Sequence, residues 1–172
     1  MSRPIELISQ TKVLFYFLLI FTFKLVDVSV KSRTITVKGP RGTLTKSFKH
    51  IKVEITLNQD ANGKYLELNC YLNTYKQSAI IYTISSHIKN MFKGVTKGFR
   101  YKMHIVKKHF PIDVTIEKEY IEIKRFLGER SVKTVKLLEG VSVSKNEKNN
   151  EELWFDGNDI DKVSLTCKKI YF

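Results

Sequence analysis

The segment from residue 74 to residue 103 constrains the fold most, because its pattern predicts a long helix followed directly by a strand. Its apolar residues recur at helical spacing and would form one buried stripe: Ile80, Ile84, Ile88, Met91 and Val95. Three lysines recur every fourth residue and would form a second, cationic stripe: Lys89, Lys93 and Lys97. The segment therefore predicts a helix that is buried on one side and basic on another.

The end of this helix is marked by two glycines, Gly94 and Gly98, since glycine commonly terminates helices. Residues 99–103 then alternate aromatic or apolar side chains with basic ones. That alternation is typical of a strand with one solvated face. A basic strand is therefore expected directly after the helix, near the middle of the chain.

Strands are predicted on both sides of the helix, because apolar and polar residues alternate there. Before the helix we expect strands from residue 28 to residue 57 with turns at Ser32-Arg33 and Gly39–Gly42, a loop at residues 58–63, and a strand at residues 65–71. After it we expect a basic strand at residues 101–110, a hairpin at residues 113–126, further strands at residues 132–155, and a last helix capped by Asn158 or Asp159.

A weak internal echo indicates a duplication. Ile35-x-Val37-Lys38-x-x-x-Gly42 is matched by Ile121-x-Ile123-Lys124-x-x-x-Gly128, at an offset of 86 residues, which is half the chain. We therefore predict an α+β fold of two similar small domains, each an antiparallel sheet with a helix packed on one face. The expected divisions are an atypical apolar segment at residues 1–26, a first repeat at residues 27–98 and a second repeat at residues 99–172.

The charge of the chain favours a polyanionic partner. Its 172 residues carry 30 Lys and Arg against 17 Asp and Glu, for a net charge of +13. Residues 31–136 hold 22 of the basic and 8 of the acidic residues, so the excess does not come from a basic tail. Such a balance indicates nucleic acid or an anionic membrane surface as partner and says little about fold.

The N-terminal run from Val13 to Phe23 has eleven residues without a charge. A membrane-spanning helix needs about twenty apolar residues, so this run is too short to cross a bilayer. It has the size of a signal-peptide core, but no convincing small-x-small cleavage site follows. A signal or anchor, a docked apolar segment, and an alternative or mispredicted first exon all stay open.

No pattern of catalytic or metal-binding residues is present in the sequence. The two cysteines, Cys70 and Cys167, form no CxxC motif, and the four histidines are scattered, so we expect no metal and no cofactor. His87 lies between Ile84 and Ile88 on the predicted helix, where a structural role is expected. We find no phosphate-binding P-loop and no G-x-S-x-G motif, and expect no enzyme.

Several sequence segments, taken in their order along the chain, resemble one ribosomal protein family. They are VKSRTITVKGPRGTLTKSFKH, SSHIKNMFKGVTKGFRYKM, YKM..V..HFPI, IEI..FLGE and GNDI..VS. Together they are similar to the sixth universally numbered protein of the large subunit, number nine in eukaryotic naming, over about residues 28–166. The chain departs from the family at residues 71–75 and at Tyr82, and it stops at Phe172, where members usually continue with a basic extension.

The resemblance implies a structural constituent of the large ribosomal subunit in the cytoplasm. It implies binding to ribosomal RNA beside the sarcin–ricin loop and near the factor-binding centre, chiefly through the second domain. The implied partners are large-subunit ribosomal RNA, neighbouring ribosomal proteins and, indirectly, translation factors; a membrane is not expected. Alternatives are a divergent non-ribosomal RNA-binding protein, a membrane-surface or secreted protein, and an enzyme acting on RNA.

Candidate RNA-binding residues are cations of the turn, the helix end and the basic strand, with aromatic neighbours for stacking. The predicted set is Lys38, Arg41, Lys46, Lys93, Lys97, Arg100, Tyr101, Lys102, Lys107, Lys108, His109, Lys124, Arg125 and Arg130.

Overall fold

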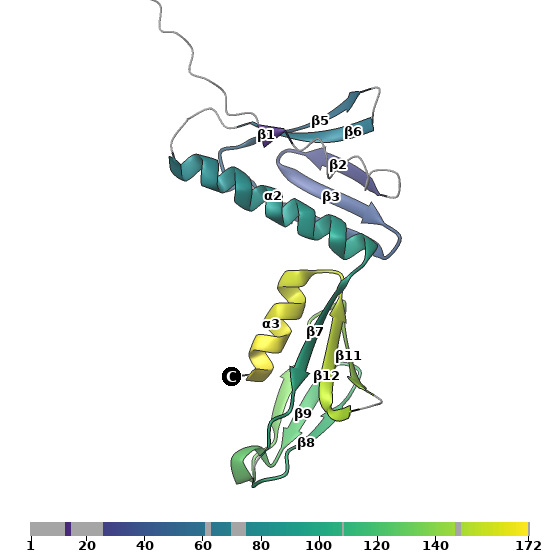
Figure 1. Ribbon diagram of the computed structural model, residues 1–172, viewed down its shortest axis with the longest axis vertical. Helices are drawn as coiled ribbons and strands as arrows, with labels where there is room; N and C mark the ends of the chain where they lie inside the picture. Colours follow the sequence, from purple (N-terminus) through teal and green to yellow (C-terminus); the bar gives the residue numbers. More distant parts are fainter. Residues whose placement is uncertain are drawn as a thin grey trace, which may run out of the picture. The chain divides into compact units, whose positions relative to one another are not determined.

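The computed structural model describes residues 13–14, 26–60, 63–69, 75–107, 109–146 and 149–171. The chain divides into two compact units, Met1–Thr96 (unit 1) and Lys97–Phe172 (unit 2), and both combine antiparallel strands with one helix (Figure 1). The predicted α+β class is confirmed.

Unit 1 holds two three-stranded antiparallel sheets. A meander joins β2 (Asp27–Lys31), β3 (Thr34–Gly39) and β4 (Gly42–Ser47). The second sheet has the order β1-β6-β5, from β1 (Val13–Leu14), β5 (Glu54–Asp60) and β6 (Gly63–Asn69). Ser32 and Arg33 have φ of 46° and 59°, so both adopt the left-handed conformation that a two-residue hairpin favours.

The long helix α2 (Tyr75–Thr96) covers the apolar face of these strands. The predicted stripe is confirmed, since Ile84, Ile88, Met91 and Val95 are buried and Ile80 packs against the same core. The helix runs through the buried Gly94 and ends at Thr96, so Gly94 does not terminate it. Gly98 follows with φ of 78°, a conformation that glycine adopts without strain.

Unit 2 is built in the same way. One sheet has the order β11-β12-β7, from β7 (Phe99–His104), β11 (Val141–Asn146) and β12 (Asn149–Gly157). The other has the order β10-β9-β8, from β8 (Asp113–Ile116), β9 (Tyr120–Lys124) and β10 (Lys133–Lys136). A short 3-10 turn, η1 (Phe126–Gly128), follows β9, and α3 (Ile160–Tyr171) ends the unit. Asp159 caps α3, because its Oδ1 accepts the Asp161 N–H at 3.0 Å.

The sequence echo reflects this repeated order of elements. Each unit has a first strand, a three-stranded meander, a hairpin and a helix, and the echo falls on β3 and β9, the middle strands of the two meanders. Ile35 and Ile121, equivalent in the echo, are both fully buried. β1 and β7 are also equivalent, since each pairs with the second strand of the hairpin in its unit.

Two predicted boundaries are wrong. The basic strand ends at His104 instead of Phe110, where its register with β12 ends; one backbone hydrogen bond follows, from the Ile105 N–H to the Glu151 oxygen at 2.7 Å. The predicted loop at residues 58–63 is shorter, because the β5–β6 ladder continues to the pair Asp60 and Gly63.

The predictions for residues 1–12 and 15–25 lie outside the described residues, and so does most of the apolar run. Among the helices that the structure describes, none has the length and apolar character needed to cross a membrane.

Candidate nucleic-acid interface

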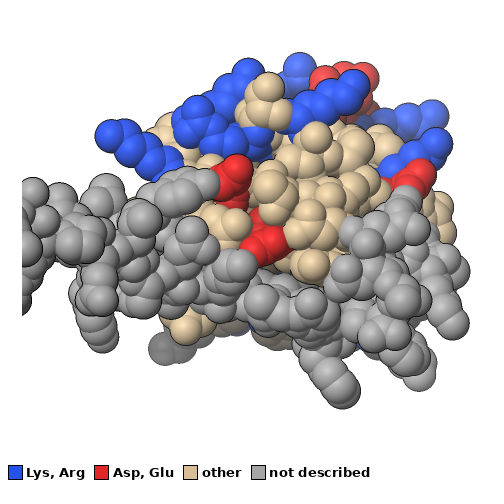
Figure 2. Space-filling view, turned by 90° about the horizontal axis from the view of Figure 1, so that it is seen from above, with Lys and Arg blue, Asp and Glu red and all other residues tan. Residues whose placement is uncertain are grey.

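The turn between β3 and β4 is fixed onto the last turn of α2. A Cβ added at Gly39 would lie 2.8 Å from the Val95 Cβ and 2.9 Å from the Val95 carbonyl oxygen, so only glycine fits this approach. The Arg41 N–H donates to the same oxygen at 3.1 Å. Three predicted residues, Lys38, Arg41 and Lys93, are therefore held at one end of unit 1. Figure 2 shows Lys and Arg side chains gathered along one edge of the face it views.

Lys46 has a different environment. It pairs with the buried Ile35 in the β3–β4 register, and its Nζ donates to the Nδ1 of His87 at 3.0 Å. The His87 ring also lies 6.4 Å from the Phe48 ring, measured between centroids. His87 therefore has a structural contact, and Lys46 is engaged with α2 rather than presented to solvent.

The strand β7 places its cations on one face of the sheet. Arg100 and Lys102 lie on the face away from α3, and Tyr101 lies on the opposite face, across from Phe155. Tyr101 is 36% exposed but does not share a face with the two cations that it was expected to accompany.

The aromatic residue beside these cations is Trp154. Arg100 donates from Nε and Nη2 to the two carboxylate oxygens of Asp156, at 2.7 and 2.9 Å. Its guanidinium carbon lies 4.5 Å from the Trp154 ring centroid, and the Lys102 Nζ lies 5.7 Å from it. The sequence reasoning missed Trp154, although its position between the apolar Leu153 and Phe155 on a strand indicates an outward side chain.

Several other predicted cations are paired with carboxylates of unit 2. Lys107 contacts Glu151 at 2.7 Å, Lys124 contacts Glu122 at 3.1 Å, and Arg125 pairs with Asp113. The hydrogen bond from Lys107 lowers the pKa of Glu151, and the hydrogen bond from Asn146 lowers the pKa of Glu152. The Asp156 carboxylate raises the pKa of Arg100 in the same way.

Comparison with known proteins decides the family. A family profile described as Ribosomal protein L6 matches residues 24–98. The large ribosomal subunit protein uL6 of Candida albicans is 41% identical over 149 residues, which cover 84% of this chain and 76% of that protein. The uL6 proteins of Tetrahymena thermophila and Ignicoccus hospitalis are 36% and 37% identical, over 85% and 84% of this chain and 77% of each relative.

The chain belongs to the ribosomal protein L6 family. The resemblance found in the sequence words is confirmed, and this family is structural rather than enzymatic. Within the ranges that the structure describes, no group of three or more His, Cys, Asp or Glu side chains could hold a metal ion.

In this L6 family member the candidate residues fall into two groups. Among the described residues, Lys38, Lys93, Lys97 and Arg130 are exposed and make no ion pair, so their charges can meet an external anion directly, and His109 is exposed as well. A paired cation can meet an external anion only by giving up its carboxylate, which costs little because surface ion pairs contribute about 0–1 kcal/mol. Lys108 lies outside the described residues.

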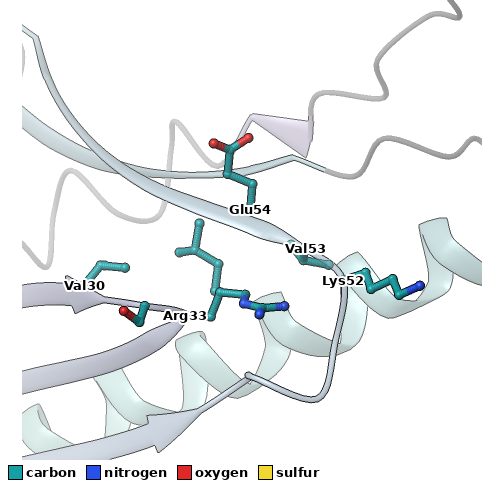
Figure 3. A pocket seen from close by; sticks show the side chains of 7 residues that line it. Val30, Arg33, Lys52, Val53 and Glu54 are labelled. Atoms are coloured by element: carbon teal, nitrogen blue, oxygen red, sulfur yellow. The ribbon is translucent and has the colours of Figure 1, made fainter.

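An open cavity of about 520 Å³ lies in unit 1 between the β2–β3 turn and the start of β5. Arg33, Lys52 and Glu54 line it beside apolar side chains (Figure 3). The Arg33 Nη1 donates to the Ile51 carbonyl oxygen at 2.8 Å, which ties the turn to the segment before β5. The cavity thus combines both signs of charge and is no selective anion site.

Proposed function

We propose that this protein is a structural constituent of the large ribosomal subunit that binds ribosomal RNA. It acts in the cytoplasm, beside the sarcin–ricin loop and near the factor-binding centre, with the second repeat, residues 99–172, as its main docking domain. The observation that carries the proposal is the similarity to uL6 proteins over 84% of the chain, which extends across both units.

Binding follows from the cations that the fold presents. Lys and Arg side chains gain affinity by neutralising phosphates and releasing counterions, while folded RNA is selected by its shape. Asp156 holds the Arg100 guanidinium by two hydrogen bonds, and the guanidinium lies over the Trp154 ring, which pre-organises it for a phosphate or a base. Neighbouring ribosomal proteins complete the environment, and translation factors are affected indirectly.

The test is a sucrose-gradient profile of cells that express the tagged full-length chain, with and without high salt. We expect the chain in large-subunit and polysome fractions, and we expect it to stay there in high salt. Protein found only at the top of the gradient, yet still bound to RNA in pull-downs, would indicate a non-ribosomal RNA-binding protein instead. Recovery with membranes would contradict both.

A further inference from the structure

The outer face of the meander β2–β3–β4 carries an unusual set of side chains. The strand register places nine residues on it, away from the core: Asp27, Ser29, Lys31, Thr34, Thr36, Lys38, Thr43, Thr45 and Ser47. Six of them are hydroxyl side chains, and the set has one acidic residue. We call these nine residues the hydroxyl face.

The hydroxyl groups of this face lie in rows across the strands. Thr36 Oγ1 lies 3.4 Å from Thr45 Oγ1, and Thr34 Oγ1 lies 3.5 Å from Ser47 Oγ. A hydroxyl can donate and accept, so each keeps capacity for an external partner. The centre of the face is therefore polar and uncharged.

Lysines stand at the two ends of this polar centre. Lys31 pairs with Thr34, and Lys38 pairs with Thr43 on one side and Asp27 on the other, so the two lysines are separated by roughly 13 Å along the strands. Both are exposed and make no ion pair among the described residues. The face thus offers two cations with a row of hydroxyls between them.

The equivalent face of unit 2 has the same register but carries charges of both signs at its centre and ends. Thr36 lies between Ser29 and Thr45, and its counterpart Glu122 lies between Thr115 and Thr134. The offset of 86 residues also places Glu117 where unit 1 has Lys31. Lys124 and Lys136 lie on the same face, and Lys124 pairs with Glu122 at 3.1 Å, so charged side chains stand where the meander of unit 1 has its row of hydroxyls.

We propose that the hydroxyl face binds the minor groove of a double-stranded RNA segment. That groove is wide and shallow in A-form RNA and displays ribose 2′-hydroxyls, which a flat sheet surface can reach. The Thr and Ser hydroxyls pair with the 2′-hydroxyls, and Lys31 and Lys38 contact phosphates on the two strands. This inference rests on the proposed RNA-binding function, and it adds a second contact surface that distinguishes RNA from DNA.

The first experiment compares RNA and DNA duplexes of one sequence, about 16 base pairs long, by fluorescence anisotropy with the full-length chain. The double variant Thr36→Val, Thr45→Val keeps shape and strand propensity but removes the central hydroxyls. We expect RNA affinity to fall roughly tenfold, since two hydrogen-bonding groups are lost, while DNA affinity stays unchanged. The matched control is Thr115→Val, Thr134→Val, which removes the equivalent hydroxyls of unit 2 and should change neither affinity.

A second variant tests the cations. In the double variant Lys31→Gln, Lys38→Gln, the slope of the logarithm of the RNA binding constant against the logarithm of salt concentration should become less negative by about two, because two phosphate contacts are removed.

Each outcome has one meaning. Equal RNA affinities for the hydroxyl variant and its control would overturn the inference. If the hydroxyl variant lost affinity for RNA and for DNA equally, the inferred contact with ribose 2′-hydroxyls would be overturned. Loss of binding to phosphatidylserine vesicles in the lysine variant, with RNA binding intact, would assign the face to lipid. If the unmodified chain binds no RNA duplex and no large subunit, the proposed function itself fails.

Discussion

Single residues show which predicted cations face solvent. Lys46 and Lys38 both lie on the β3–β4 ladder, but the first contacts His87 and the second is exposed. Strand alternation sets this difference: on β4 Lys46 lies on the core side with Leu44, whereas on β3 Lys38 follows the buried Val37 and lies on the opposite face.

Lys46→Met should therefore act on stability and not on RNA affinity. The substitution keeps the aliphatic stem and removes the hydrogen bond to His87, so we expect unfolding to become easier by roughly 1 kcal/mol. Urea unfolding and RNA titration at neutral pH measure the two effects. Lys38→Gln is the control and should weaken RNA binding with little change in stability; the reverse pattern would contradict the placement of Lys46.

Gly39→Ala should destabilise unit 1, because its new Cβ would lie 2.9 Å from the Val95 carbonyl oxygen, which belongs to a packed helix end. Overpacking of this kind costs about 1–3 kcal/mol. Gly140→Ala is a useful comparison, since nothing lies within 4 Å of that site and any cost there comes from its φ of 83°. A Gly39→Ala variant as stable as the parent in urea would show that the turn does not pack tightly on α2.

At the scale of elements, the β7–β12 ladder combines ion pairs with an aromatic side chain. Trp154 is the one tryptophan of the chain, so tryptophan fluorescence reports on the site where Arg100 and Lys102 contact its ring. We expect RNA to change the emission, because a phosphate that engages Arg100 alters the contact between guanidinium and indole.

Arg100→Gln should abolish this emission change and weaken RNA binding. Arg130→Gln is the control, which should weaken binding but keep the emission change, since no ring contact involves Arg130 among the described residues. Binding seen by anisotropy without any change in emission would exclude Arg100 and Lys102 from the interface.

The same ladder predicts a response to acid. The pKa values of Glu151 and Glu152 are lowered from an ordinary 4.5 by Lys107 and Asn146. Their contribution to stability is therefore present above the unfolded-state pKa and is lost as pH falls through the folded-state pKa. We expect the Tm to fall between about pH 5 and pH 3, and the double variant Glu151→Gln, Glu152→Gln to show a shallower fall. An identical pH profile would contradict these pairings.

The sequence was sufficient to predict the helices and hairpins, but it was insufficient to predict which side chains contact one another. The helix stripe from Ile80 to Val95 was predictable because helical periodicity is local, and the hairpins were predictable from turn residues. The contact of Arg100 with Asp156 joins residues 56 positions apart, so only the register of β7 on β12 reveals it. The division of the candidate cations into paired and unpaired groups could not be predicted for the same reason.

At the scale of the whole molecule, the formal charge overstates the charge available to RNA. The chain carries +13, but several candidate cations are already paired with carboxylates. We expect the logarithm of the RNA binding constant to fall with the logarithm of salt concentration with a slope of about −5, since about 0.9 is expected for each phosphate contact of Lys31, Lys38, Lys93, Lys97, Arg100 and Arg130. A slope near −10 would mean that the internal ion pairs open on binding, and a salt series with one RNA duplex distinguishes the two.

The duplicated meander has a consequence for assembly. A molecule with two nearly identical faces could be seated on its target in two ways, with one repeat standing in for the other. The exchange of Thr36 for Glu122 between the repeats removes that degeneracy, because a carboxylate in one repeat stands where the other has a hydroxyl, and the two faces cannot make the same contacts with phosphate. The difference between two equivalent positions thus allows a pseudo-symmetric protein to bind a uniformly charged surface in one orientation.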